Sequence, residues 1–514
     1  MNLLTYEQAL GSEDGCREEY LMYEGLRNTW AGQPLVRKNM LIDGKWVAAS
    51  DQATLSCLDP YSEQEWAEVP VATVSDVDHA VSSARRAFDS GIWSNAPPAA
   101  RFAALRRLGQ LIEDNVEALA LAQVRENGKL MTEMVPSTRA VASDSHFFGA
   151  LGEMTHGYTV EPSIPNFTAY TRREPIGVVA AITPWNNPLV LLGWKLFPAL
   201  AAGNTIVIKP SEVTPVSTLM LGELIEKAGI PAGVVNIITG AGATGQALVQ
   251  HPDVDKIAFT GSTQTGVAIA KIAAERQARV SLELGGKSPN IVFNDANLSS
   301  AINGVIGGIF AAAGQACNAG SRVLVQRGVY NEFLERLSQR ANAFRMGDPL
   351  AADTEIGPLS SRAQMAKVTS YFDIARGENL NLAAGGVRLD RPGLFVSPTV
   401  YADPPKASRL VREEIFGPVA MVMPFDDEQE AVTLANDTIF GLASGVWTQN
   451  LSLAHRMIKK IRAGTVWVNT YRMGGHVIPF GGFKASGVGR EMGLHALDQY
   501  TESKSVWINT DAQS

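Results

Sequence analysis

The chain alternates short apolar runs with longer segments in which apolar residues recur at helical spacing. From about residue 176, the runs IGVVAAITP, NTIVIKP, GVVNIIT and KIAFTGS each have the length and β-branched content of a buried strand. Helix-like segments separate them, and Gly203 stands where the first of these segments should stop. Strands that alternate with helices are typical of βαβ units and a parallel sheet. The pattern therefore predicts a doubly wound, Rossmann-like domain of the nucleotide-binding type.

A second series of apolar runs begins near residue 288 and continues to about residue 470. The runs SPNIVF, RVLVQ, AMVMPF, ASGVWT and GTVWVNT are strand-like, and helical segments such as YNEFLERLSQRANAF lie between them. The sequence therefore predicts an α/β fold with two parallel or mixed-sheet lobes. We expect a Rossmann-like cofactor domain of residues 30–152 and 176–284 and an α/β catalytic domain of residues 285–484.

Residues 153–175 interrupt this rhythm with alternating, proline-broken sequence, and the tail around SKSVWINT is also strand-like. A small β-hairpin of this kind leaves strand edges exposed unless another chain pairs with them. We therefore expect residues 153–175 and 498–514 to form an oligomerisation segment in a homodimer or homotetramer.

The composition is ordinary for a globular chain of several domains: 514 residues, of which 46% are hydrophobic and 19% charged, with a formal net charge of -8. No run of lysine and arginine provides the clustered basic face that a phosphate backbone needs, so no nucleic-acid partner is expected. The N-terminus lacks the features of a signal peptide, and no apolar run reaches the roughly 18 residues of a membrane span. These patterns predict a cytoplasmic protein without a membrane partner.

The cysteines, Cys16, Cys57 and Cys317, are scattered and show no C-x-x-C spacing, so we expect neither a disulfide framework nor a bound metal. Cys317 differs from a packing cysteine because its neighbours in GQACNAGSR are small and leave room around the sulfur. A nucleophilic thiol needs activation, and the seven histidines include no recognisable partner motif. Activation by a bound cationic nicotinamide and by backbone N–H groups is the hypothesis that remains.

Two glycine motifs are candidates for holding a dinucleotide. Gly240, Gly242 and Gly245 have the G-x-G-x-x-G spacing after a predicted strand, but the acidic residue expected about 20 positions later is absent, which favours an ordinary strand-to-helix turn. Gly261 and Ser262 lead from a strand directly into a helix, whose free N–H groups favour an anion. They predict the phosphate site, with a simple helix-capping serine as the alternative.

Charged residues also lie at the ends of two predicted strands, IVIK and SLEL. Lys209 and Glu212 in IVIKPSE lie where ribose hydroxyls sit on a doubly wound sheet, although a solvated turn explains them equally well. Glu283 in SLELGGKSP lies at the proposed junction of the two lobes, where a partly dry carboxylate has a raised pKa and can act as a general base. The alternative for Glu283 is a capping role.

Seven motifs together resemble those of the hydrolytic members of the aldehyde dehydrogenase superfamily. They are TPWNNP, KPSE, FTGST, ELGGKSP, GQACNAGSR, EEIFGPV and PFGGFKASGVGRE. The resemblance extends over roughly residues 40–510 in the family's order. It implies that Cys317 is the nucleophile, that Glu283 is the general base, and that Asn186 and the Cys317 backbone N–H stabilise the oxyanion. Glu491 of GRE resembles a second carboxylate that relays protons.

The resemblance also implies sites for the cofactor and the substrate. The residues that it implies for NAD are Trp185, Lys209, Glu212, Gly261, Ser262, Glu414 and Phe416. The residues that it implies for the substrate tunnel, including departures from the family's usual pattern, are Asn187, Trp194, Arg472, Gly474 and His476. Arg472 and His476 predict a more basic tunnel, and Gly474 a wider one. We therefore expect either a semialdehyde that carries a carboxylate or a bulky aromatic aldehyde.

The implied reaction is oxidation of an aldehyde to a carboxylic acid with NAD, through a thiohemiacetal and a thioester on Cys317. NADP is disfavoured because Glu212 would meet a 2′-phosphate with like charge. One alternative is a CoA-acylating dehydrogenase, against which the presence of Glu283 argues. A cofactor-independent cysteine hydrolase or esterase is another. A scaffold without activity is the third, and it would be expected to lack Cys317, Glu283 or Asn186.

Overall fold

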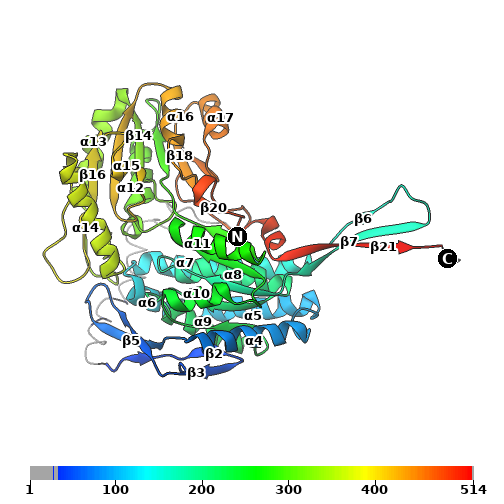
Figure 1. Ribbon diagram of the computed structural model, residues 1–514. Coiled ribbons are helices and arrows are strands. Elements are labelled where there is room, and N and C mark those ends of the chain that lie inside the picture. The colour runs from blue at the N-terminus through cyan, green and yellow to red at the C-terminus, as the bar shows by residue number, and fades with distance from the viewer. Residues whose placement is uncertain (1–22, 24–26, 28–32, 512–514) are drawn as a thin grey trace.

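The computed structural model describes Tyr23, Arg27 and residues 33–511, and it consists of two α/β lobes from which a narrow β-sheet projects (Figure 1). The fold class predicted from the hydrophobic pattern is confirmed. Cys16 and the outermost parts of two predicted segments, 30–32 and 512–514, lie outside the described residues.

The sheet of the first lobe has eight strands in the order β20-β12-β11-β8-β9-β10-β2-β3. The strands from β12 to β10 run parallel, β20 and β2 pair antiparallel with the two ends of this block, and β3 pairs antiparallel with β2. The bounds are β2 (Met40–Ile42), β3 (Lys45–Val47), β8 (Val178–Ile182), β9 (Thr205–Lys209), β10 (Val235–Ile237), β11 (Lys256–Thr260), β12 (Arg279–Glu283) and β20 (Gly487–Val488).

Helices cover both faces of this sheet and bury separate hydrophobic cores. One core contains apolar side chains of α4, α10 and α11, and the other contains those of α5, α7, α8 and α9. The helix α8 has proline at its first position and ends at Gly203, whose φ of 95° is the left-handed conformation that glycine adopts without strain. The bounds are α4 (Val74–Asp89), α5 (Pro98–Asp114), α6 (Val116–Asn127), α7 (Met131–Glu153), α8 (Pro188–Ala202), α9 (Val216–Lys227), α10 (Gly242–Gln250) and α11 (Thr263–Glu275).

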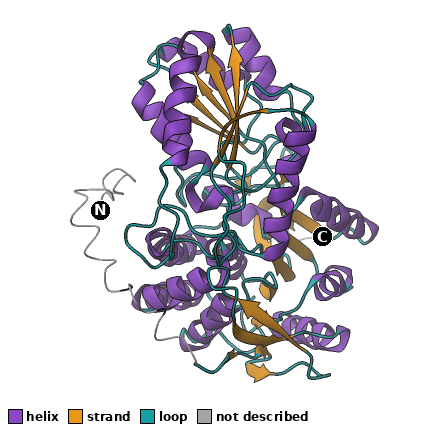
Figure 2. Cartoon of the chain, turned by 90° about the vertical axis from the view of Figure 1, so that its left-hand side faces the viewer, coloured by secondary structure: helices purple, strands orange, loops and turns teal. Residues whose placement is uncertain are grey.

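The second lobe is a seven-stranded sheet in the order β15-β16-β17-β14-β13-β18-β19, parallel except for β15 and flanked by helices (Figure 2). Its strands are β13 (Pro289–Val292), β14 (Arg322–Gln326), β15 (Asn381–Ala384), β16 (Thr399–Ala402), β17 (Val419–Phe425), β18 (Ala443–Trp447) and β19 (Thr465–Val468). Its helices are α12 (Leu298–Ile309), η1 (Ala311–Gly314), α13 (Arg327–Asn342), α14 (Arg362–Gly377), α15 (Arg409–Arg412), α16 (Glu428–Asn436) and α17 (Leu451–Lys460).

Two three-stranded sheets complete the fold. The projecting sheet pairs β21 (Thr501–Asn509) with β7 (Phe167–Pro175) and β7 with β6 (Thr159–Val160), all antiparallel. The other sheet joins β1 (Val36–Arg37), β5 (Glu65–Pro70) and β4 (Thr54–Leu58), and the sequence pattern did not predict it. The chain between β19 and β21 also contains the short helices η2 (Lys484–Ser486) and η3 (Leu494–Gln499). None of the helices in the described ranges is long and apolar enough to cross a membrane.

The parallel strands of the first lobe end together at one edge. Ile182 pairs with Lys209 on one side and with Phe259 on the other, and Thr260 pairs with Glu283. The residues that follow each strand therefore emerge side by side, facing the second lobe. This edge is where a doubly wound sheet binds its ligands.

Candidate active site

Glu283 is the last residue of β12, and its carboxyl group is enclosed by protein. The residue is 4% exposed, and neither carboxyl oxygen accepts a hydrogen bond within the described part of the chain. Burial raises the pKa of Glu283 well above its ordinary value, and the nearby charge of Glu491 raises it further. A carboxyl group in this environment holds its proton at higher pH than a surface glutamate does, as a general base near neutrality requires.

Cys317 lies on a loop that follows an unusual turn at the end of α12. Ala312, Ala313 and Gly314 have positive φ angles of 56°, 51° and 69°, a left-handed conformation that is strained for the two alanines. The loop packs directly on the segment after Glu283, because a Cβ at Gly286 would lie 2.4 Å from the Cys317 carbonyl oxygen. The structure therefore brings the thiol and the buried carboxyl group together.

The environment of Cys317 disfavours the thiolate in the free protein. The pKa of the Cys317 thiol is raised to about 12, mainly by burial and also by the carboxylates of Glu283 and Glu414. The Arg472 guanidinium and the backbone N–H of Asn318 act in the opposite direction. A thiol with this pKa needs an additional positive charge or hydrogen-bond donor before it attacks a carbonyl.

Asn186, in the loop after β8, reaches the same place. Its side chain is buried, and its Nδ2 donates a hydrogen bond to the carbonyl oxygen of Gln315 at 3.0 Å. Gln315 precedes Cys317 by two residues, so the amide is anchored to the loop that carries the thiol.

Glu491 forms a buried ion pair that the sequence did not predict. Its Oε1 accepts a hydrogen bond from Lys195 Nζ at 2.6 Å, and Lys195 also donates to Thr260 Oγ1 at 2.6 Å. Burial raises the pKa of Glu491, and the Lys195 charge opposes this shift. The only sequence signal for Lys195 is a single lysine within the otherwise apolar helix PLVLLGWKLFPALAA. Lys195 therefore links Thr260, at the end of β11, to the carboxyl group of Glu491, which lies near Glu283.

The candidate adenosine-binding residues lie at the same edge of the sheet. Lys209 ends β9 and its Nζ lies 3.5 Å from Glu212 Oε2, whose side chain is 50% exposed. Burial lowers the pKa of Lys209, and Glu212 opposes the change. The first turn of α10 borders this pair, because a Cβ at Gly245 would lie 3.9 Å from the Lys209 side chain.

Gly261 and Ser262 connect β11 to α11. The Gly261 N–H donates to the Glu283 carbonyl oxygen at 3.0 Å, so this turn is tied to the end of β12. Ser262 is the N-cap of α11 and its Oγ accepts from the Thr265 N–H at 3.2 Å. The serine therefore caps the helix, and α11 begins directly after the strand end that pairs with Glu283.

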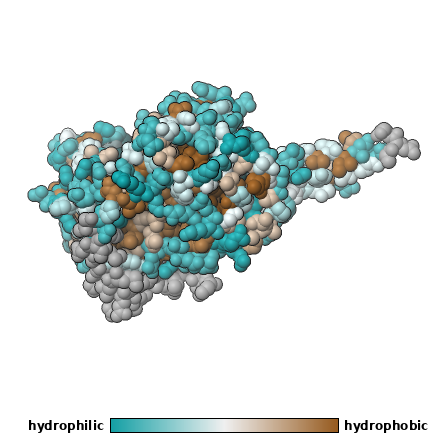
Figure 3. All heavy atoms as spheres, turned by 90° about the horizontal axis from the view of Figure 1, so that it is seen from below, coloured by the Kyte–Doolittle hydropathy of each residue, from teal (hydrophilic) through white to brown (hydrophobic). Residues whose placement is uncertain are grey.

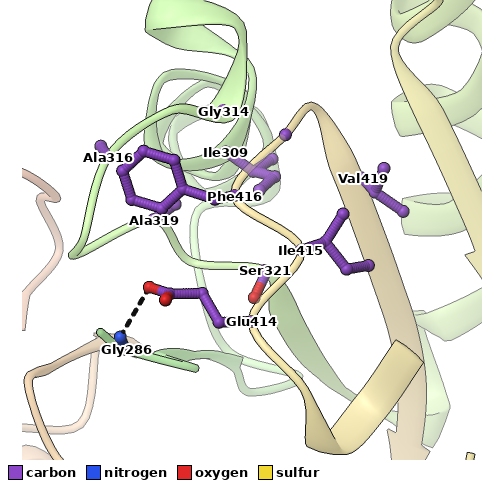
Figure 4. A pocket seen from close by; sticks show the side chains of 11 residues that line it. Gly286, Ile309, Gly314, Ala316, Ala319, Ser321, Glu414, Ile415, Phe416 and Val419 are labelled. Carbon is purple, nitrogen blue, oxygen red and sulfur yellow. Dashed lines mark hydrogen bonds between the residues drawn. The ribbon is translucent and has the colours of Figure 1, made fainter. Parts of the chain in front are cut away.

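A pocket lined by residues between Gly286 and Val419 contains the two candidate residues of the EEIFGPV motif (Figure 4). Glu414 Oε1 accepts a hydrogen bond from the Gly286 N–H at 2.9 Å, and burial raises the pKa of Glu414. Phe416 has a positive φ of 60°, and its ring meets that of Trp185 edge to face, with 5.2 Å between centroids. Figure 4 shows the Phe416 ring beside Ala316, the residue before Cys317, and the Glu414 carboxylate directed toward Gly286.

The candidate substrate residues form two groups. In the first, Asn187 accepts a hydrogen bond from Lys129 Nζ. Arg472 Nη1 donates to the carbonyl oxygens of Gly307 at 3.2 Å and Ala311 at 3.4 Å, so part of the guanidinium is used to bind the end of α12. Lys129 was not predicted from the sequence.

The second group lies around the side chain of Asp144 on α7. His476 Nδ1 is 3.6 Å from Asp144 Oδ1, and the Trp194 side chain donates a hydrogen bond to this carboxyl group. Burial raises the pKa of Asp144 to about 7. Trp194 also contacts the Phe480 ring, with 5.2 Å between centroids. Gly474, in the same loop as His476, is exposed, and a Cβ there would meet nothing within 4 Å.

Within the ranges that the structure describes, no three histidine, cysteine, aspartate or glutamate side chains are grouped so that they could hold a metal ion. The candidate site therefore consists of a thiol, buried carboxyl groups and amides where two α/β lobes meet.

Residues 46–506 match the aldehyde dehydrogenase family. Because this match spans most of the chain, the protein belongs to the aldehyde dehydrogenase family, whose members are oxidoreductases that act on aldehydes.

Relatives and solved structures agree with this assignment. The chain is 44% identical over 476 residues to an aldehyde dehydrogenase of Aspergillus niger, covering 92% of this chain and 95% of that protein. It is 41% identical over 478 residues to a betaine aldehyde dehydrogenase of Bacillus subtilis, covering 92% of this chain and 98% of that protein. The structure of an NAD+ complex of aldehyde dehydrogenase from Bacillus cereus superposes with a TM-score of 0.91 at 43% identity, covering 95% of this chain and 99% of that chain.

Proposed function

We propose that this protein oxidises an aldehyde to a carboxylic acid with NAD+, through a covalent adduct on Cys317. The observation that carries the proposal is the meeting of Cys317, Glu283 and Asn186 at the junction of the lobes. Asn186 Nδ2 donates a hydrogen bond to the carbonyl oxygen of Gln315, two residues before Cys317. A carbonyl substrate at the sulfur would therefore lie beside the Asn186 amide and the backbone N–H of Cys317.

The Cys317 thiolate attacks the aldehyde carbon, and Asn186 Nδ2 and the Cys317 N–H donate to the oxygen that becomes negative. Such donors contribute about 3 to 4 kcal/mol each to the transition state when they are preorganised. The small residues Ala316 and Ala319 beside the thiol leave space for a tetrahedral carbon.

Glu283 then acts on the thioester that remains on Cys317. Its carboxylate removes a proton from water, the hydroxide attacks the thioester carbon, and the acid leaves as the thiol is regenerated. The Lys195–Glu491 pair lies beside Glu283 and offers a path for the proton. Because its raised pKa keeps Glu283 protonated at low pH, this step accelerates as pH rises.

The residues present fit a dinucleotide, which when bound accepts the hydride from the adduct. A Cβ at Gly242 would meet nothing within 4 Å, so the sheet edge near Lys209 is open. The Glu212 carboxylate is placed to accept hydrogen bonds from ribose hydroxyls, which favours NAD over NADP because a 2′-phosphate would be repelled. The free N–H groups at the N-terminus of α11 favour an anion such as the pyrophosphate, and Glu414 is the residue that we assign to the second ribose.

Arg472, Gly474 and the named relatives each support a different class of substrate. Arg472 binds two backbone carbonyls through Nη1 alone, and a guanidinium at this position supports a substrate with a carboxylate tail. The open space at Gly474 supports a bulky aromatic aldehyde instead. Relatives that are betaine aldehyde dehydrogenases make betaine aldehyde a third candidate.

The test is NADH formation from a panel of aldehydes: a semialdehyde with a terminal carboxylate, its methyl ester, an aromatic aldehyde and betaine aldehyde, each with NAD+ and with NADP+. The wild type should oxidise at least one with NAD+ preferred, and Cys317→Ala should abolish turnover while NAD+ still binds. Cys57→Ala, which removes a buried thiol of β4, should retain turnover. Ester hydrolysis without any NADH would instead identify a cysteine hydrolase, and dependence on CoA would identify an acylating enzyme.

A further inference from the structure

The strained turn before Cys317 needs contacts that hold it in place. Ala312 and Ala313 adopt the left-handed conformation, with φ angles of 56° and 51°. Residues other than glycine keep this conformation only where the surrounding structure enforces it. Because Cys317 follows on the same loop, the contacts that enforce the turn also determine where the loop presents the thiol.

One peptide group of this turn is bound from both sides. The N–H of Ala312 donates a hydrogen bond to Glu133 Oε1 at 2.7 Å. The carbonyl oxygen of the same peptide group, that of Ala311, accepts from Arg472 Nη1 at 3.4 Å. The bond to the carboxylate is the shorter of the two and is of the stronger, charge-assisted kind. Rotation of the peptide group changes the φ angle of Ala312 and would break both contacts.

Glu133 is itself held in position at the start of α7. Its second carboxyl oxygen, Oε2, accepts a hydrogen bond from the Leu130 N–H at 3.1 Å. Met131, the first residue of α7, donates its N–H to the carbonyl oxygen of Pro349 at 2.9 Å. The first turn of α7 is therefore bound to two segments of the second lobe, one at Pro349 and one at Ala312.

The helix α7 also packs in the part of the first lobe that carries Asn186. Apolar side chains of α7 and α8 share one hydrophobic core, and α8 begins directly after Asn187. Asn186 donates to the carbonyl oxygen of Gln315 on the Cys317 loop. The bond from the turn to Glu133 is therefore a second connection between the elements that present the amide and the loop that presents the thiol.

We propose that Glu133 is a positioning residue for the reaction, whose carboxylate fixes the peptide group between Ala311 and Ala312 and thereby the turn that presents Cys317. The inference rests on the proposed function, in which Cys317 is the nucleophile and Asn186 an oxyanion donor. Glu133 acts through the backbone of the turn, without contact with the reacting atoms.

The experiment measures amide hydrogen exchange in the full-length protein, without substrate or cofactor, by mass spectrometry of a peptide that spans residues 310–317. In Glu133→Ala the Ala312 N–H loses its acceptor, so this peptide should exchange about tenfold faster than in the wild type. Glu133→Gln keeps the shape but offers one neutral acceptor oxygen to the N–H groups of Ala312 and Leu130. It should give a smaller acceleration, of about threefold.

Glu153→Ala is the matched control, because it removes an exposed carboxylate at the last residue of the same helix and should leave exchange in residues 310–317 unchanged. A role of Glu133 confined to the start of α7 would accelerate exchange in residues 130–134 alone, and this result would overturn the inference. Wild-type exchange of residues 310–317 in Glu133→Gln decides in the same way if Glu133→Ala fails to fold.

The kinetic measurement connects the turn to the reaction. In Glu133→Ala, kcat/KM for the aldehyde should fall about tenfold while the Kd for NAD+ stays at the wild-type value, because the thiol is misplaced and the cofactor residues are not. Faster exchange together with wild-type kcat/KM would show that the turn does not position the thiol. Hydrogen exchange needs no aldehyde, so a failure of this inference is distinguishable from a failure of the proposed reaction.

Discussion

Glu283 illustrates how a functional residue reduces stability at the scale of a single side chain. Its carboxyl oxygens are buried and accept no hydrogen bond from the described residues, a situation that costs free energy on folding unless the group is neutral. The protonated form avoids much of this cost. The role that we propose for Glu283 needs the carboxylate, so the charge state that this role requires is the less stable one in the fold.

This conflict predicts a pH-dependent stability difference between wild type and Glu283→Gln. The folded protein holds the Glu283 proton above the pH at which the unfolded chain releases it, so wild-type stability declines as pH rises beyond about 4.5, the ordinary glutamate range. The amide does not titrate. Thermal unfolding should therefore show Glu283→Gln with a higher midpoint than wild type at pH 8 and with a smaller advantage at pH 5.

A constant difference at both pH values would contradict this account of Glu283. Glu502→Gln is a suitable control, because that carboxylate lies on the exposed surface of β21.

At the scale of elements, the site depends on backbone segments that approach more closely than side chains allow. The segment after β12 lies against the Cys317 loop at Gly286 and against the Glu414 carboxylate at Gly285, where a Cβ would be 2.3 Å from Oε2. These contacts hold the end of one sheet against a loop of the other lobe. The separation between Glu283 and Cys317 is therefore set by the packing of these glycines.

Gly286→Ala should disturb this arrangement, since its Cβ would overlap the Cys317 carbonyl oxygen at 2.4 Å and one of the two segments must move. A displacement of about 1 Å at a reacting group can reduce the rate on the order of 100-fold, and we expect kcat/KM for the aldehyde to fall by about this factor.

Gly377→Ala is the matched control. Gly377 ends α14, and an added Cβ there would meet nothing within 4 Å, so kcat/KM should be unchanged. Wild-type kcat/KM in Gly286→Ala would show that the loop contact does not position the thiol.

At the scale of the whole molecule, the projecting sheet carries large apolar side chains that this chain leaves exposed. Figure 3 shows hydrophobic atoms along this extension. Trp507 is 57% exposed, Ile508 46% and Val160 42%. Exposed apolar side chains on open strand edges are typical of a surface that pairs with another chain.

Trp507→Lys should therefore shift the protein toward smaller assemblies, because the substitution places a charge on the proposed subunit interface. Light scattering after size-exclusion chromatography measures the mass directly. Ile439→Lys, at a residue that is 65% exposed on the second lobe, should leave the mass unchanged. An unaltered mass in Trp507→Lys would remove this sheet from the interface.

The sequence alone predicted those structural features that depend on residues close together in the chain. Apolar periodicity located the strands from β8 to β11, and Gly203 located the end of α8. These features follow from backbone conformational preference and side-chain size, which neighbouring residues determine. The domain roles and the site roles taken from motif resemblance remain predictions.

The tertiary structure alone decided which distant groups share an environment. Lys195 and Glu491 are 296 positions apart and form one buried pair, and β20 is only two residues long yet extends the first sheet from the far end of the chain. Lys129 meets Asn187 because the connection after α6 crosses the site. Such contacts depend on how the helices and sheets pack, and burial then sets the pKa of each group. No local pattern specifies that packing, so the charges that surround Cys317 became visible only in the fold.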